Sequence, residues 1–239
     1  LNGDNESNTI YEISDLPDSS FRYQDYEFNG GWVRLRKDSI RYTDTLHSDY
    51  FSTAIMIDQS DSAESFNFSD PYNQRFQSIN GFFKTLNGGG DVIFSAYSRN
   101  GKLNKDTLTI FNNSFLNNWD EKTAKTLLDL THTTGGTSSM YDAMYKMLTF
   151  VGQQPGENKS IVVLARNKDD NKSSRTVDDL IQLAKTNNIK INIIWMIKDT
   201  KNVDLYAFSK MPTKTGGFLI YLGNIYQLST AFLSLQKIL

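Results

Sequence analysis

From residue 53 onward, short apolar runs alternate with stretches in which apolar residues recur at steps of three and four. An apolar run bounded by polar residues is typical of a strand buried on both faces of a parallel sheet. The strands that this pattern predicts lie at 53–57, 91–98, 161–165, 189–197 and 218–222, with a shorter one at 107–111 that we expect at an edge.

The stretches between these runs place their apolar residues on one face of a helix. The predicted helices lie at 72–86, 121–130, 141–151, 173–185, 203–210 and 225–235. Asp70-Pro71 is expected to start the first, and Thr137 or Ser138 to cap the third. Because strands alternate with helices, we predict an α/β fold: a three-layer, doubly wound sandwich around a mainly parallel sheet.

The first part of the chain has a different pattern. Residues 1–20 are expected to be extended or loose chain, whereas 23–28 and 32–35 are strand-like. Asn29-Gly30-Gly31 lies between these two segments and is typical of a hairpin turn. We therefore predict an N-terminal extension with a short β-hairpin over 1–52 and one α/β domain over 53–239.

Composition narrows the classes of function. The formal net charge is −2 and no basic block stands out, which argues against nucleic acid as the main partner. The absence of cysteine excludes disulfides, zinc–thiolate sites and thiol nucleophiles. No apolar run approaches the roughly 20 residues that a membrane-spanning helix needs.

Asp58 ends the apolar run 53–57, and the carboxyl ends of strands are where open α/β sheets bind ligands. Ser60 and Ser62 follow at spacings of two, which can aim three oxygen-bearing side chains at one point. Hard divalent cations such as Mg²⁺ prefer such oxygen ligands. The local pattern therefore makes Asp58, Ser60 and Ser62 candidate metal ligands.

Three motifs in order resemble the metal-ion-dependent adhesion site of von Willebrand factor A (vWA) domains: Asp58-x-Ser60-x-Ser62, Gly135-Gly136-Thr137 with Asp142-Ala143, and Thr215-Gly216-Gly217. The resemblance covers about 53–239. It implies a vWA-type fold and a divalent cation, Mg²⁺ or another, bound by Asp58, Ser60, Ser62 and Thr137. It also implies a protein partner, whose carboxylate often completes the coordination of the ion in this family.

One position departs from the family pattern, because Arg166 stands where an aspartate usually ends the fourth strand. Repulsion between an arginine and a dication a few ångströms away is several kcal/mol even at an effective dielectric of about 20. Either Arg166 pairs with Asp58, or it points away and Asp169 or Asp170 turns in. With Arg166 beside Asp58, cation binding is expected to be weak or absent.

Two classes of function follow. The first is a non-enzymatic, adhesion-type vWA module of an exported bacterial protein, which binds a partner at the Asp58 end of the sheet. The alternative is a metal-independent scaffold or assembly component of a cell-envelope complex. An enzyme is disfavoured, because the two histidines, His47 and His132, leave few nucleophile–base pairs and no nucleophile elbow surrounds Ser60.

The expected location is extracytoplasmic, at the cell surface or in the periplasm. This expectation rests on the polar start of the chain, the abundance of Asn, Ser and Thr, and the lack of cysteine. Residues 1–8 resemble the tether that follows the lipidated cysteine of a bacterial lipoprotein, which would place a lipid anchor upstream of Leu1. A frayed terminus is the alternative, and the sequence leaves both open.

Overall fold

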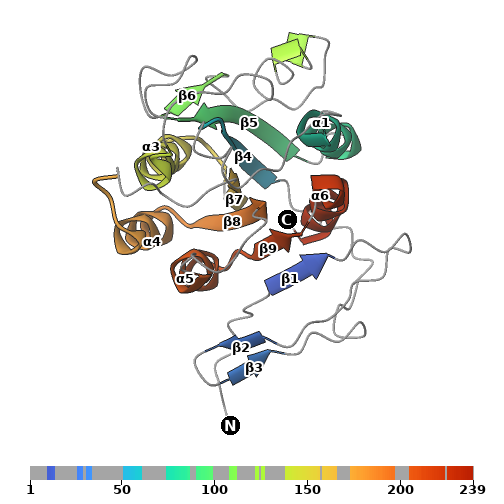
Figure 1. Cartoon of the computed structure of the whole chain (residues 1–239). Coiled ribbons are helices and arrows are strands. Elements are labelled where there is room, and N and C mark those ends of the chain that lie inside the picture. The colour runs from blue at the N-terminus through green and yellow to red at the C-terminus, as the bar shows by residue number, and fades with distance from the viewer. Residues whose placement is uncertain are drawn as a thin grey trace.

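A seven-stranded sheet organises the chain, with strand order β1-β9-β8-β7-β4-β5-β6 (Figure 1). The computed structural model describes residues 10–13, 26–28, 31–33, 51–60, 74–86, 90–98, 108–111, 122–123, 125–126, 138–156, 158–165, 173–196, 205–223 and 225–238. The strands of the sheet are β1 (Ile10–Ile13), β4 (Phe51–Asp58), β5 (Gly90–Tyr97), β6 (Leu108–Ile110), β7 (Asn158–Ala165), β8 (Ile189–Met196) and β9 (Leu219–Leu222).

The pairing of the strands confirms the predicted fold class. β4 lies inside the sheet, parallel to β5 on one side and to β7 on the other. β7, β8, β9 and β1 continue the parallel arrangement, and β6 alone pairs antiparallel, at the edge beside β5. β4 is internal because Ala54 to Ile57 are apolar on both faces and have no exposed surface.

Helices cover both faces of the sheet (Figure 1). Alternate residues of β4 pack to opposite sides, with Ile55 and Ile57 in one hydrophobic cluster and Ala54 and Met56 in the other. The first cluster lies under α1 (Gln74–Leu86), η2 (Ile225–Gln227) and α6 (Leu228–Ile238). The second lies under α3 (Met140–Gly152), α4 (Val177–Thr186) and α5 (Leu205–Thr215), which completes the three predicted layers.

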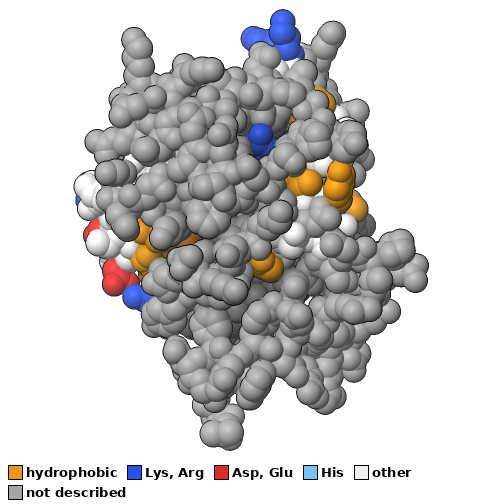
Figure 2. Space-filling view, viewed as in Figure 1, with side chains coloured by type: hydrophobic (Ala, Val, Ile, Leu, Met, Phe, Trp, Pro, Cys, Tyr) orange, Lys and Arg blue, Asp and Glu red, His pale blue; other side chains and the backbone are white. Residues whose placement is uncertain are grey.

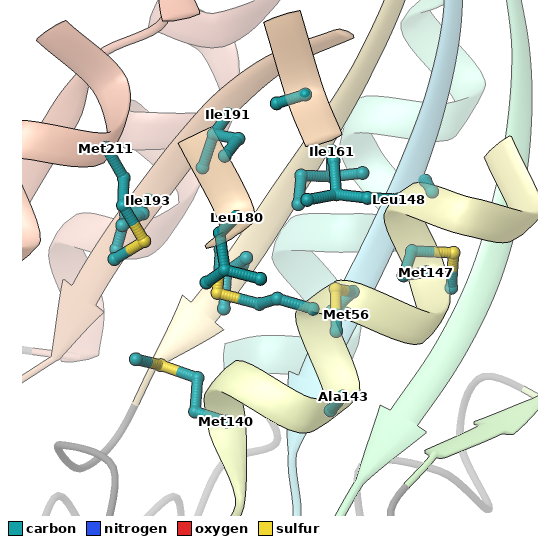
Figure 3. Packing of buried hydrophobic residues seen from close by; sticks show 14 of the residues in the cluster. Met56, Met140, Ala143, Met147, Leu148, Ile161, Leu180, Ile191, Ile193 and Met211 are labelled. Atoms are coloured by element: carbon teal, nitrogen blue, oxygen red, sulfur yellow. The ribbon is translucent and has the colours of Figure 1, made fainter. Parts of the chain in front are cut away.

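The layer under α3 and α4 is rich in methionine (Figure 3). Met56 on β4, Met140, Met144 and Met147 on α3, and Met211 on α5 all belong to this cluster and have no exposed surface. Methionine is unbranched and polarisable, so it fills irregular gaps between helices and a twisted sheet. Burial of each such side chain stabilises the fold by about 1.5–3 kcal/mol.

Two helix boundaries differ from the predictions. α4 begins at Val177 rather than 173, because Thr176 caps it. Thr176 Oγ1 accepts a hydrogen bond from Asp179 N at 3.2 Å, and Asp179 Oδ2 accepts from Thr176 N at 2.8 Å, which is a capping box. α5 runs to Thr215 rather than 210 and includes Pro212, because buried Phe208 and Met211 anchor it to the sheet. Here packing overrides the tendency of proline to end a helix.

The start of α3 also differs from the prediction. Its N-cap is Ser139 rather than Ser138, and the Ser139 side chain makes no capping hydrogen bond. Ser139 is fully buried, so local capping preference does not decide where this helix begins. Thr137, Asp70 and Pro71 lie outside the described residues. Of the helix predicted at 121–130, residues 122, 123, 125 and 126 are helical.

The N-terminal extension contributes two kinds of strand. β2 (Tyr26–Phe28) and β3 (Gly31–Val33) pair antiparallel, with Tyr26 opposite Val33, where the hairpin was predicted. β1 lies in the segment that was expected to be extended or loose chain, and it pairs parallel with β9, Ile10 opposite Leu219. The sequence did not predict that residues 10–13 join the main sheet, and a domain boundary at residue 52 stays a prediction.

The described surface is mixed in character. Figure 2 shows acidic and basic side chains close together on one side of the molecule. Lys210 of α5 and Asp178 of α4 form an ion pair at 2.6 Å. Asp178 is largely exposed, so this pair contributes little to stability. Among the described residues, the exposed large apolar side chains are Tyr226 on η2 and Leu233 on α6.

Candidate functional site

Asp58 lies in a row of residues that crosses the carboxyl edge of the sheet. It pairs with Tyr97 on β5, and the Ile57–Leu164 pair places Ala165 of β7 at the next position on its other side. Ala165 pairs with Trp195, and Trp195 with Tyr221. Residues in one row of a parallel sheet project to one face, and the other four pack with the α3 cluster. The row continues to β1, where Glu12 pairs with Tyr221, so Asp58 and Glu12 are its charged residues. Asp58 faces the α3 layer.

The carboxylate of Asp58 is held by the residue two positions later. Its Oδ1 accepts hydrogen bonds from Ser60 N at 2.9 Å and from Ser60 Oγ at 2.7 Å. Both side chains are fully buried. Hydrogen bonds to an ionised acceptor are stronger than neutral ones, so this turn holds the carboxylate in one orientation. The structure thus brings together Asp58 and Ser60, as the spacing of the motif predicts.

The pair fits one edge of a cation site. Ser60 Oγ donates its proton to Asp58, which leaves its lone pairs available to an ion. Neighbouring ligands of an octahedral Mg²⁺ with bonds of about 2.1 Å lie about 3 Å apart, close to the 2.7 Å between these two oxygens. Within the described ranges, no three His, Cys, Asp or Glu residues come together, so hydroxyl oxygens would have to supply part of a metal site.

The other residues of the predicted site lie outside the described residues: the ligands Ser62 and Thr137, Arg166 in place of the usual aspartate, and the alternatives Asp169 and Asp170. The described chain reaches the neighbours of two of them. Ala165 precedes Arg166 and lies at the level of Asp58 in the sheet register. Ser138, which follows Thr137, is fully buried before α3. The proximity of Arg166 to Asp58 stays a prediction.

Arg75 contacts the carboxyl edge of the sheet at Asp58, and the sequence did not predict this contact. It lies in the first turn of α1, is 5% exposed, and donates from Nη1 to the carbonyl oxygen of Asp58 at 3.3 Å. A cation is unfavourable at a helix amino terminus, because the helix dipole is positive there. An arginine in the first turn of a predicted helix is therefore the signal that would have indicated a binding role for this side chain.

Asp142 makes the second contact that the sequence did not predict. Its Oδ1 accepts from Ser174 N at 2.9 Å, Ser174 Oγ at 3.1 Å and Arg175 N at 3.0 Å. Its own backbone N donates to Ser173 Oγ at 3.1 Å. The guanidinium of Arg175 lies 4.0 Å from the ring centre of Tyr145, a cation–π contact. Asp142 therefore joins the first turn of α3 to the segment that starts α4.

The Thr215-Gly216-Gly217 motif has a structural role instead. Thr215 Oγ1 accepts from Ile191 N at 3.0 Å and donates to Met211 O at 2.8 Å. Gly216 has a positive φ of 72°, and a Cβ on Gly217 would lie 2.0 Å from Ile191 O. Tyr221, at the level of Asp58, is four residues further along, about 13 Å in a strand. This motif packs β9 against β8 and is not part of the candidate site.

No family model matches the sequence, and no curated protein matches it. Among the residues that the structure describes, no helix is long and apolar enough to cross a membrane.

Several solved structures share the fold. The pilus adhesin SpaC from Lactobacillus rhamnosus GG, in its open conformation, matches with a TM-score of 0.59 and 9% identity, over 79% of this chain and 30% of that one. A von Willebrand factor type A protein from Catenulispora acidiphila matches with a TM-score of 0.55 and 18% identity, over 79% of this chain and 42% of that one.

The PilB minor pilin from Streptococcus sanguinis matches with a TM-score of 0.54 and 11% identity, over 82% of this chain and 62% of that one. The chain thus spans less than two thirds of the length of each of these proteins. At such low identity the likeness concerns the fold alone. The chain has the α/β architecture of vWA domains, at a level where the sequence matches no family model.

Proposed function

We propose that this chain is a non-enzymatic, adhesion-type module that binds a protein partner at the Asp58 end of its sheet. The observation that carries the proposal is the buried carboxylate of Asp58, whose Oδ1 is held at 2.9 Å and 2.7 Å by Ser60 N and Oγ. Positive charge stabilises a buried carboxylate at the carboxyl end of a central strand, and a divalent cation is one source of it.

In this proposal Asp58, Ser60, Ser62 and Thr137 hold Mg²⁺ or another divalent cation. The bound ion would supply a positive charge and an open coordination position for a carboxylate of the partner. Ser60 orients the Asp58 carboxylate, and the row neighbours Tyr97 and Ala165 shield it from water. Because Asp58 has no exposed surface, the partner contacts the ion rather than the aspartate.

The solved structures support an adhesion role by their own descriptions. SpaC is described as a pilus adhesin and PilB as a minor pilin, and both share the fold of this chain. We extend that role to this chain, and with it an extracytoplasmic location at the surface of a bacterial cell. Fractionation of the native cells tests the location, because recovery of the full-length product in the cytosol alone would exclude it.

The second candidate is a metal-independent scaffold or assembly component of a cell-envelope complex. Arg166 favours it, because a guanidinium beside Asp58 would neutralise the carboxylate without an ion. Both candidates place the partner at the carboxyl edge of the sheet, and they differ in the need for a cation.

Calorimetric titration with Mg²⁺ and Mn²⁺ separates the two candidates. Binding that is lost in Asp58→Asn and weakened in Ser60→Ala supports the metal-dependent module. Ser234→Ala is the matched control, since Ser234 lies on α6 and its Oγ donates within that helix to Thr230 O. Absence of binding by the unmodified protein supports the scaffold. Turnover in an esterase, protease and phosphatase screen, abolished by Ser60→Ala, would overturn both.

A further inference from the structure

The sheet ends at β6, and the ladder between β5 and β6 shows which backbone groups of β6 face outward. β6 is the edge strand and pairs antiparallel with β5 (Figure 1). Phe111 N donates to Phe94 O at 3.0 Å, so these two residues form a hydrogen-bonded pair. Such pairs alternate with non-hydrogen-bonded ones, which makes Thr109 and Ala96 the next hydrogen-bonded pair. Thr109 and Phe111 therefore direct their N–H and C=O groups toward β5.

The other two residues of β6 direct the same groups away from β5. The N–H and C=O groups of Leu108 and Ile110 point to the outer side of β6, where no strand of the described chain lies. Together they offer two donors and two acceptors. All three residues of β6 are only partly buried, so a further strand has access to this edge.

The sequence around β6 lacks the features that usually protect a sheet edge. Natural edge strands carry charged side chains or proline, which oppose pairing with another chain. Residues 107–119 include no charged residue and no proline. The opposite edge strand, β1, does carry a charge, at Glu12. Thr109 and Ile110 are β-branched, which favours a paired strand. The edge at β6 is therefore suited to pairing with a further strand.

We propose that β6 pairs antiparallel with β6 of a second copy of this chain, about a two-fold axis at Thr109. The reason for a second copy is the position of the outward-facing groups. Leu108 and Ile110 lie one residue before and one residue after Thr109, so Leu108 of each copy lies opposite Ile110 of the other. Both pairs are hydrogen-bonded pairs, and each exchanges two hydrogen bonds. An identical strand thus satisfies every outward-facing group, and a two-fold contact closes the assembly at a dimer.

The side chains at the centre of this contact are compatible with the pairing. Thr109 of one copy lies opposite Thr109 of the other, in a non-hydrogen-bonded pair, and Thr–Thr pairs are favourable across strands. Leu108 and Ile110 are partly buried and pack against the α3 cluster. Their cross-strand pairing extends the apolar layer of one copy into that of the other.

The dimer directs its two Asp58 sites in opposite directions. β6 is antiparallel to β5 in each copy, so pairing of the two β6 strands makes the two β5 strands antiparallel to each other. The carboxyl edges of the two sheets, where Asp58 lies, are then at opposite ends of the dimer. The pairing does not depend on the proposed function and goes beyond it, because two sites on one dimer can bind two partners.

The chain has no cysteine, so a single introduced cysteine tests the register. In Thr109→Cys the two Cα atoms are about 4.5 Å apart across the axis, within the disulfide range of about 4.4–6.8 Å. With oxidised glutathione as the oxidant, this variant should form a covalent dimer about tenfold faster than Thr186→Cys, because pairing raises the effective concentration of the thiols. Thr186 is the matched control, exposed on α4.

A second cysteine separates this register from general association of the edge. In Ile110→Cys the two thiols lie diagonally across the strands, with Cα atoms about 7–8 Å apart. That separation is outside the disulfide range. Ile110→Cys should therefore crosslink as slowly as Thr186→Cys.

A charge exchange tests the same contact without a covalent bond. In sedimentation equilibrium, the mass of the unmodified protein should rise with concentration from one chain toward two. Thr109→Lys and Thr109→Glu each place like charges opposite each other, so each should remain a monomer. Mixing the two variants places opposite charges at the axis and should restore the dimer. Thr186→Lys should behave like the unmodified protein.

Three results would overturn the proposal. The first is crosslinking of Thr109→Cys no faster than that of Thr186→Cys or Ile110→Cys. The second is the mass of one chain at every concentration of the unmodified protein, which is the outcome if a strand of a different protein occupies this edge. The third is a dimer that Thr109→Lys leaves intact. None of these bears on the cation titration at Asp58, so the proposed function stands or fails separately.

Discussion

Gly217→Ala is the substitution with the most direct steric consequence. A Cβ at this position would lie 2.0 Å from Ile191 O, 2.6 Å from Ile191 C and 2.9 Å from Asn192 Oδ1. Real Cβ contacts below 3.0 Å are essentially absent, so β9 must move away from β8 by about 1 Å. The clashing atoms are mainly backbone of an internal strand, and no side-chain rotation can relieve the overlap.

The expected loss of stability follows from two terms. Overpacking of this kind costs about 1–3 kcal/mol. Separating the strands also weakens two hydrogen bonds, Ile193 N to Phe218 O at 2.9 Å and Phe218 N to Asn192 Oδ1 at 3.3 Å. At about 0.5–1.5 kcal/mol each, they bring the central expectation to about 4 kcal/mol. For a chain of this size that lowers Tm by about 8–16 °C.

Urea unfolding followed by tryptophan fluorescence measures this loss, because Trp195 stacks on Phe208 in the core with ring centres 4.4 Å apart. Gly81→Ala is the matched control, because Gly81 is exposed on α1 and nothing lies within 4 Å of a Cβ added there. This variant should gain about 0.5–1 kcal/mol in the free energy of unfolding. If Gly217→Ala is as stable as Gly81→Ala, β9 does not pack on β8 in the way described.

Three further predictions concern the site edge. Arg166→Asp should raise Mg²⁺ and Mn²⁺ affinity in calorimetry, and Arg166→Ala should give a smaller gain; tight binding that Arg166→Asp leaves unchanged would mean that another residue, such as Asp169, completes the site. Asp142→Ala should lower the free energy of unfolding by about 1–2 kcal/mol, and Asp142→Asn, which keeps the acceptor, should recover most of it; equal losses would contradict the hydrogen-bond reasoning. Hydrogen bonds from the Thr176 backbone and side chain lower the pKa of Asp179 below 3.8. The contribution of this carboxylate to the free energy of unfolding is therefore complete above pH 3.8 and is lost as the pH falls through the folded pKa. The acid limb of the stability–pH curve should therefore be shallower in Asp179→Asn, and an unchanged limb would exclude a role for this carboxylate.

Local patterns predicted those elements that depend on local chemistry. The run at 53–57 was internal because four successive apolar residues can be buried on both faces only between two strands. β1 was missed, because its strand state depends on pairing with β9, more than 200 residues away in the sequence. The extent of α5 was missed for a similar reason, since the packing of Phe208 and Met211 overrides Pro212.

The contacts of the candidate site also fall into two kinds: a local contact that the sequence predicts and long-range contacts that it does not. Asp58 and Ser60 are two residues apart, so their contact follows from the spacing of the motif. Arg75 reaches Asp58 across 17 residues, and Asp142 reaches Ser174 across 32. Such contacts depend on where the helices begin relative to the sheet edge. The spacing of side chains along the sequence does not predict that position.

The methionine-rich core has a consequence for redox chemistry. The chain has six methionines and no cysteine, and all six thioethers, including that of Met196, have no exposed surface. Folded molecules therefore present no sulfur to peroxide or hypochlorite, and sulfoxide can form only when a helix opens from the sheet. The rate of methionine oxidation, measured for each peptide by mass spectrometry, therefore reports how often α3, α5 and β4 open to solvent.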